Sequence, residues 1–174
     1  MGIWDVKKDS EREQWVFVPH VGVGPLRFGM APDEVSAALG SNAPVSRLVQ
    51  RSSGNYELVE AQFTELGVTA YYGTRQALAC VAVDVLAGPQ VMLDDAFLVA
   101  RVPSEAEDWL CKHTEVHELD LIYTHAADPG SADLGLILRA QRAGDIVLSR
   151  PLFLIREWAE NSWDCIPGEE WSRF

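Results

Sequence analysis

Apolar and polar residues alternate with a period of two in several short runs, a pattern typical of strands with one buried face. The clearest runs are Leu58–Phe63, Val68–Tyr72 and Leu78–Leu86, and turn-forming residues separate them at 65–67 and 73–76. Connections this short place consecutive strands side by side. We therefore predict a meander of three antiparallel strands over residues 56–86.

A short helix is expected ahead of this meander, over residues 32–39. Pro32 suits a first helical turn, and the acidic pair Asp33-Glu34 favours the positive end of the helix dipole. Gly40 provides the end signal. The apolar residues of this stretch fall on one face and predict its buried side: Val35, Ala38 and Leu39.

The segments around this helix are less regular. The apolar run Gln14–Val18 ends at Pro19, which predicts an edge strand. Residues 26–28 alternate like a second short strand. Residues 41–55 are rich in turn formers and predict a loop, with one further helical turn around residues 45–49.

The order of strand, helix and meander returns after Gly88-Pro89. Residues 97–111 can be laid on the first strand and helix at an offset of 71, which places Pro103 opposite Pro32. Residues 134–138 match 66–70 at an offset of 68, and 146–151 take the place of the third strand. Two matches in the same order favour an internal duplication, and the alternative is chance similarity between two stretches of the same type.

The prediction is therefore an α+β protein of two tandem units, each a helix with an antiparallel sheet, and with the helices packed on one face of the sheet. Four segments follow from it: residues 1–20 (N-terminal extension and edge strand), 21–88 (first unit), 89–156 (second unit) and 157–174 (Trp-rich C-terminal tail).

The run from Gly24 to Gly40 combines a strand, Gly29-Met30, a small residue, Glu34-Val35 and Leu39-Gly40. It resembles the signature of small bacterial repeat domains, which include BamE-type outer-membrane assembly lipoproteins and, in tandem form, the β-lactamase inhibitor protein family. The resemblance implies helices on one face of an antiparallel sheet and a role in binding proteins. Ala100 replaces Gly29 in the second unit. We interpret Gly29 as allowing a close backbone approach that Ala100 no longer requires.

The chain carries 26 acidic and 14 basic residues, a formal net charge of −12. This balance disfavours nucleic acid and anionic membranes, because both are bound largely through Lys and Arg. It favours a basic protein partner through faster association, although acidity also serves solubility alone. The N-terminal residues have no apolar signal-peptide core, and no apolar stretch is long enough to span a membrane. We expect a cytoplasmic protein.

The tail contains three of the six tryptophans. An acidic and aromatic segment either docks onto the sheet of its own subunit or presents its rings to another chain, since Trp is a preferred interface anchor. Candidate interface residues are the three tail tryptophans and two tyrosines of the meander: Trp158, Trp163, Trp171, Tyr71 and Tyr72.

Candidate chemistry is sparse. His113 and His117 are four residues apart, but Glu115 is misplaced for a zinc-hydrolase motif and only His125 follows. Asp94-Asp95 is expected to be a solvated turn, since neighbouring strand residues point to opposite faces. The three cysteines are too dispersed to form a redox motif, and Cys80 lies in an aliphatic run typical of an inert thiol. We predict no catalytic residue, metal or cofactor.

The leading hypothesis is a non-enzymatic, intracellular protein-binding module, most concretely an immunity or inhibitor protein that neutralises a toxin. The first alternative is a small-ligand binder or enzyme with a pocket between sheet and helices. Its candidate residues are Arg75, His113, His117 and Tyr71. The second alternative is a structural homodimer joined through the tail tryptophans.

Overall fold

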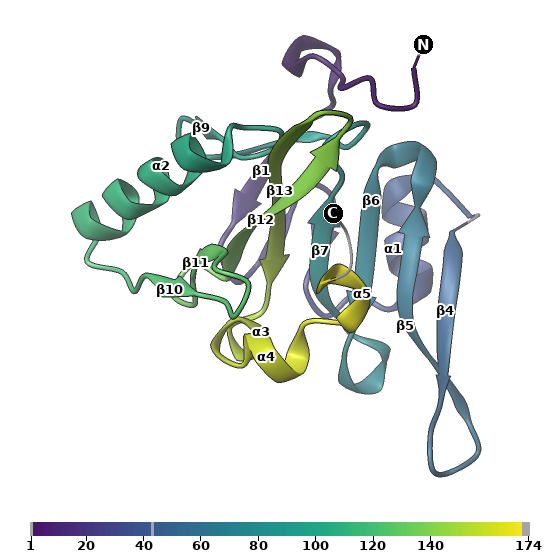
Figure 1. Ribbon diagram of the computed structural model, residues 1–174. Helices are drawn as coiled ribbons and strands as arrows, with labels where there is room; N and C mark the ends of the chain where they lie inside the picture. The colour runs from purple at the N-terminus through teal and green to yellow at the C-terminus, as the bar shows by residue number, and fades with distance from the viewer. Residues whose placement is uncertain (1, 43, 172–174) are drawn as a thin grey trace.

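The computed structural model describes residues 2–42 and 44–171 and is a mixed structure of helices and two β-sheets (Figure 1). Its strands are β1 (Gln14–Val18), β2 (Gly22–Val23), β3 (Leu26–Arg27), β4 (Val45–Gln50), β5 (Tyr56–Phe63), β6 (Val68–Tyr72), β7 (Leu78–Val83), β8 (Gln90–Leu93), β9 (Ala96–Phe97), β10 (Ile122–Tyr123), β11 (Pro129–Ser131), β12 (Leu136–Ala143) and β13 (Ile146–Leu154).

The helices are α1 (Pro32–Leu39), α2 (Pro103–Val116), α3 (Arg156–Glu160), α4 (Ser162–Cys165) and α5 (Gly168–Trp171), with 3-10 turns η1 (Asp9–Glu11), η2 (Thr64–Leu66) and η3 (Thr74–Gln76). None of the helices in the described ranges has both the length and the apolar character needed to cross a membrane. The predicted N-terminal extension, the loop at 41–55 and the tail each include residues outside this description.

The large sheet has eight strands in the order β10-β11-β12-β13-β7-β6-β5-β4. Strands β5, β6 and β7 pair antiparallel in sequence, which confirms the predicted meander. Strand β13 pairs antiparallel with β7 and joins the two halves of the chain in one sheet. The last large-sheet strand of each half, β7 and β13, therefore lies at the centre of the sheet, and the earlier strands of each half lie progressively further out.

The small sheet has the order β3-β2-β1-β8-β9. Strand β1 lies at its centre because it pairs antiparallel with β2 and parallel with β8. The expectation of an edge strand at this position was wrong. Pro19 follows the last residue of β1 and ends the strand, so it removes no hydrogen bond from the ladder.

Residues 45–49 do not form a helical turn. They belong to β4, which pairs with β5 from Val45↔Gln62 to Gln50↔Tyr56. The prediction failed because Val45, Leu48 and Val49 fit a short helical face as well as a strand, and the pairing with β5 decides between them. Strand β4 forms one edge of the large sheet.

Helix α1 has the predicted bounds, with Pro32 in its first turn and Gly40 in the left-handed conformation (φ 64°) as its cap. Gly29, however, is not at a close approach, because a Cβ there would meet no atom within 4 Å. Its φ of 92° is what favours glycine, and Ala100 adopts a positive φ of 57° at the corresponding place. The second half thus keeps the positive φ of this turn although Ala100 replaces the glycine.

Matching hydrogen bonds occur in the two halves. In the first, the amide of Gly29 donates to Leu78 (2.9 Å) and the amide of Leu78 donates to Met30 (2.9 Å). At an offset of 71, the amide of Ala100 donates to Ser149 (2.9 Å) and that of Ser149 donates to Arg101 (2.8 Å). Gly67 and Gly135, 68 residues apart, both have positive φ, 64° and 68°.

Alternate residues of the large sheet belong to two hydrophobic clusters on its opposite faces. The first cluster includes residues of the small sheet, α1 and α2, and in it the rings of Phe17 and Phe153 lie 4.7 Å apart. The second includes Cys80 and Ala82 of β7 together with Ala159 and Ile166 of the C-terminal segment. In Figure 1, α1 lies behind the large sheet and α5 lies in front of it near β6 and β7, so helices lie on both faces and not on one face as expected. The C-terminal segment thus docks onto its own sheet.

Candidate functional sites

The face of the large sheet under the C-terminal segment, here called the covered face, carries an ordered set of polar side chains. Strand register brings Arg47, Glu60 and Tyr71 into one row across β4, β5 and β6. Arg139 and Arg150 are direct cross-strand partners on β12 and β13 and are only 4% and 1% exposed. Two like charges in direct opposition destabilise a strand pair, so this arrangement requires nearby anions.

The C-terminal segment supplies one of these anions. The carboxylate of Glu170, which is fully buried, accepts hydrogen bonds from Arg150 Nε (2.5 Å) and from the Tyr71 hydroxyl (2.5 Å). The carbonyl oxygen of Glu170 accepts a further bond from Arg139. Asp128 accepts from Arg139 Nε at 2.9 Å. Both arginines are therefore neutralised within the chain.

Burial by itself lowers the pKa of Arg150, but the attraction of Glu170 and its hydrogen bond outweigh that effect and leave the pKa raised. At the edge of the sheet, Arg47 bonds Glu60 (3.2 Å) and the tail residue Glu169 (2.9 Å). Two consecutive tail carboxylates thus bind arginines from the two halves of the chain.

The predicted interface residues are divided between buried and exposed positions. Tyr71 and Tyr72 are 0% and 4% exposed. Trp171 lies beneath the Arg139 guanidinium, 4.5 Å from its ring centroid, and Trp158 packs against the second cluster. Trp163 is 70% exposed, with its ring beside His125. Trp163 is therefore the member of the predicted set that is most open to solvent.

Tyr72 faces the opposite way from Tyr71, into the first cluster. Its hydroxyl is buried and has no hydrogen-bond partner among the described residues. Burial raises the pKa of Tyr72 to about 12.

Cys80, on the covered face, is fully buried. Burial is the main cause that raises the pKa of its thiol well above the ordinary value, and the nearby charge of Glu170 is the second. The prediction of an unreactive thiol agrees with this direction.

A row of apolar side chains is exposed on the outer face of the small sheet. Register places Val16 of β1 beside Met92 of β8, and Met92 beside Phe97 of β9. Val16 is 56% exposed, Phe97 is 38% exposed, and Met92 is half-buried. Val18 of β1 and Val21 of the turn before β2, at 45% and 48%, are exposed next to this row. We call these five residues the outer row.

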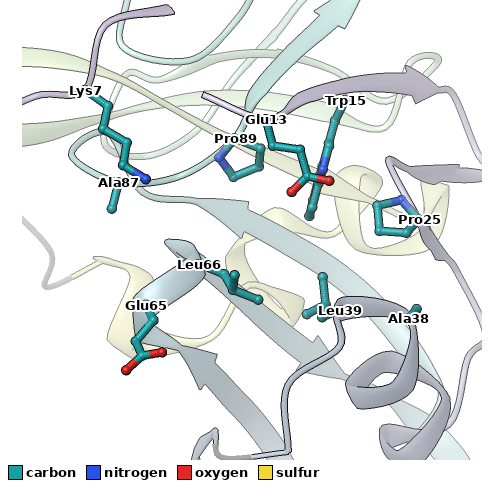
Figure 2. Close-up of a pocket in the computed structure, with 10 residues that line it drawn as sticks. All are labelled: Lys7, Glu13, Trp15, Pro25, Ala38, Leu39, Glu65, Leu66, Ala87 and Pro89. Atoms are coloured by element: carbon teal, nitrogen blue, oxygen red, sulfur yellow. The ribbon is translucent and has the colours of Figure 1, made fainter. Parts of the chain in front are cut away.

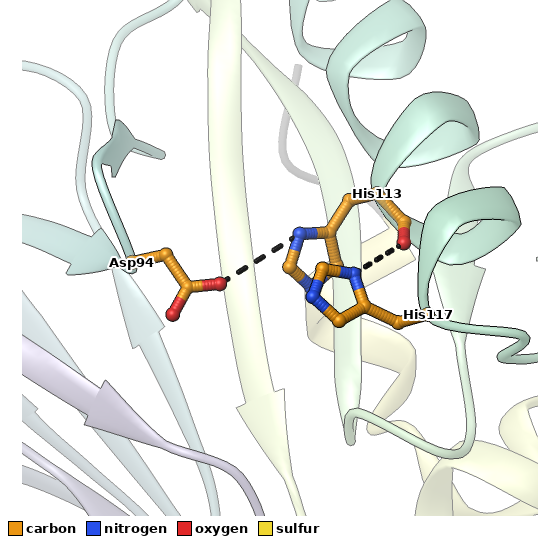
Figure 3. A group of neighbouring side chains, drawn as sticks. All are labelled: Asp94, His113 and His117. Carbon is orange, nitrogen blue, oxygen red and sulfur yellow. Dashed lines mark hydrogen bonds and ion pairs between the residues drawn. The ribbon is translucent and has the colours of Figure 1, made fainter.

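Asp94, His113 and His117 converge at the side of α2 (Figure 3). His113 is in the last turn of α2, His117 is the residue that caps this helix, and Asp94 lies in the turn between β8 and β9. The possible ligand atoms all lie within 4.8 Å of one another, and His113 Nδ1 is 3.9 Å from Asp94 Oδ2. The sequence identified the histidine pair and the solvated turn, but it gave no sign that the two meet.

The pKa of His113 is lowered, first by burial and then by the neighbouring His117, while Asp94 acts in the opposite sense. The His113 imidazole is therefore neutral at neutral pH. The other residues of the pocket hypothesis lie elsewhere: Tyr71 is beneath the tail, and Arg75 lines an open groove of about 600 Å³ beside Trp158. The structure does not bring these four residues together.

A small cavity of about 120 Å³ lies between β1, the end of α1 and η2 (Figure 2). Trp15 forms one wall, and its Nε1 is buried without a hydrogen-bond partner in the described part of the chain. Leu39 and Leu66 line the cavity opposite Trp15, and Lys7 and Glu13 also line it. Drug-sized ligands occupy cavities of about 300–1,000 Å³, so this space suits only a few atoms.

A scan against protein-family models, a search of curated proteins and a search of solved structures each gave no match to this chain.

Proposed function

We propose that the protein is a non-enzymatic protein-binding module of the immunity or inhibitor type, which binds its partner through the outer row. The observation that carries the proposal is the in-register exposure of Val16, Met92 and Phe97 on a sheet face. Contiguous exposed apolar side chains are costly in a soluble protein, and they commonly mark an interaction surface.

The chain's charge complements this surface. A net charge of −12 accelerates encounter with a basic protein, while the apolar residues supply the contact itself. Association is expected to slow as salt is added, because screening weakens the long-range attraction. Trp163, whose ring is mostly exposed, belongs to the tail on the opposite side of the large sheet, so it would serve a separate contact.

We also propose that the fold arose from two tandem units related by duplication, as in the inhibitor-like repeats that the sequence resembles. The matched hydrogen bonds of Gly29 and Ala100 and the positive φ of Gly67 and Gly135 support it. The first unit would then begin before residue 21, because β1 lies beside β8 in the small sheet and β8 is already part of residues 89–156.

The test uses two matched substitutions in a tagged full-length bait, expressed in its native cells with neighbouring genes intact. Val16→Asp and Val147→Asp change the same side chain to the same charge at similar exposure, 56% and 49%, on different sheets. We expect a partner recovered by the unmodified chain to be lost with Val16→Asp and kept with Val147→Asp. Recovery of no partner, or equal recovery by both variants, would contradict the proposal.

A further inference from the structure

We propose that Asp94, His113 and His117 form a binding site for a divalent transition-metal ion, with Zn²⁺ as the ion to be tried first. Two imidazoles and one carboxylate approach one point from two elements, and nothing in the proposed protein-binding role requires this convergence. This inference is independent of the outer row and of any partner.

The helix provides the first two ligands. Residues four apart lie on one face of an α-helix, and the rings of His113 and His117 accordingly stack with their centroids 4.2 Å apart. Trp109, one turn earlier, stacks on His113 at 4.9 Å and packs against the first hydrophobic cluster. His113 is only 10% exposed, so its position is set by packing on both sides.

The hydrogen bonding of His117 leaves it suited to bind a metal. Its Nδ1 lies 2.8 Å from the carbonyl oxygen of His113, and a nitrogen in that position donates a proton. The lone pair then resides on Nε2. Metal-binding histidines commonly donate their second nitrogen to a carbonyl or carboxylate in this way, which fixes the ring and its tautomer.

The third ligand is placed by the β8–β9 hairpin. Leu93 pairs with Ala96, so Asp94 and Asp95 form a two-residue turn, and Asp94 takes a positive φ of 50° that Asp tolerates better than most residues. The Asp94 side chain is 66% exposed. It can therefore rotate towards the histidines without disturbing the core.

The donor set indicates the class of ion. Imidazole nitrogens favour Zn²⁺, Co²⁺, Ni²⁺ and Cu²⁺, whereas Mg²⁺ and Ca²⁺ prefer oxygen ligands. Bonds of about 2.0–2.1 Å to a tetrahedral ion require donor atoms roughly 3.3 Å apart, so the present separations, from 3.9 Å to at most 4.8 Å, must shorten by about 0.6–1.5 Å. Three protein ligands leave a fourth position for water or for a group from another molecule.

The test is calorimetric titration of ZnCl₂ into the full-length, chelator-treated protein. We expect one ion per chain with a dissociation constant of about 1–10 µM. His117→Ala and Asp94→Asn, both at exposed positions, should weaken binding about tenfold or more. His125→Gln, an exposed histidine outside the cluster, should bind zinc as the unmodified protein does.

Cobalt provides a second readout that a general loss of fold cannot imitate. Co²⁺ bound at a four-coordinate site gives stronger visible absorption than the hydrated ion, and this absorption should fall in Asp94→Asn while circular dichroism stays unchanged. The proposal is overturned if the unmodified protein binds no zinc below about 100 µM. It is also overturned if Asp94→Asn and His117→Ala bind zinc as well as His125→Gln does.

Discussion

The covered face and the Asp94–His113–His117 cluster both bring ionisable side chains together, but they do so in opposite ways. On the covered face, Arg150 is 1% exposed and bonds a fully buried Glu170 at 2.5 Å. In the cluster, the nearest charged contact is a 3.9 Å approach between His113 and Asp94. The first arrangement is saturated by the chain itself, and the second leaves donor atoms available.

This difference separates a structural network from a candidate site. A buried charge that is already paired and hydrogen-bonded has little left to offer a ligand, and disturbing it exposes an uncompensated ion. Partly exposed imidazoles and a carboxylate that converge without bonding one another retain their capacity for an external ion. The covered face should therefore control stability, and the cluster should affect stability only when metal is present.

The largest effect is expected from Glu170→Gln. It removes the anion shared by Arg150 and Tyr71 and leaves the buried arginine with only the more distant carboxylate of Asp84, 3.9 Å away. We expect the free energy of unfolding to fall by about 3–5 kcal/mol, measured by urea denaturation. Glu169→Gln is the matched control. Its carboxylate is 42% exposed, so its loss should cost under about 1 kcal/mol.

A double substitution sharpens this comparison. Arg150→Met combined with Glu170→Leu removes both charges and should recover much of the loss caused by Glu170→Gln, because apolar pairs of similar volume often replace buried ion pairs without penalty. Arg139 keeps its bond to Asp128 in that variant. If the double variant is less stable than Glu170→Gln, the shape of these side chains rather than their charge determines the stability of the covered face.

Substitution of the two adjacent tyrosines should change the free energy of unfolding by intermediate amounts, with a loss at Tyr71 and a gain at Tyr72. Tyr71→Phe loses a hydrogen bond to a charged acceptor and should cost about 1.5–3 kcal/mol. Tyr72→Phe removes a buried hydroxyl with no partner in the described ranges and should gain about 1 kcal/mol. Chemical denaturation of the two single variants measures both changes. Equal losses would mean that the Tyr72 hydroxyl has a partner, such as an ordered water.

The smallest effect is expected at the cluster in the absence of metal. Asp94→Asn should change the free energy of unfolding by under about 0.5 kcal/mol when a chelator is present, since the side chain is exposed and forms no close ion pair. Zinc at one hundred times its dissociation constant should stabilise the unmodified protein by about 2.7 kcal/mol and the variant by much less. Thermal melts with and without zinc would measure both differences.

The sequence predicted the local elements better than their assembly. Pro32, Gly40 and the alternation in residues 56–83 act over a few residues, and α1 and the meander followed from them. The central position of β1 depends on its pairing with β8, which no local pattern encodes. The strand at 45–50 was missed for the same reason, since its pairing with β5 outweighs its ambiguous pattern.

The candidate sites divide in the same manner. The spacing of His113 and His117 was visible in the sequence, but Asp94 is nineteen positions before His113 and reaches it only through the hairpin. Likewise, the aromatic tail suggested docking, whereas the opposition of Arg139 and Arg150 that gives Glu170 its role arises from strand register. The outer row also depends on strand register, because Val16 and Phe97 are neighbours of the same residue, Met92 of β8, on its two sides.

The parallel pairing of β1 with β8 has a consequence for synthesis of the chain. Gln14 leaves the ribosome 76 residues before its partner Gln90, a delay of roughly 4–15 s at ordinary translation rates. During that interval, one side of β1 has no strand to pair with, and its apolar residues are accessible to chaperones or to other nascent chains. Completion of the large sheet comes later still, because β7 must wait for Leu152–Leu154.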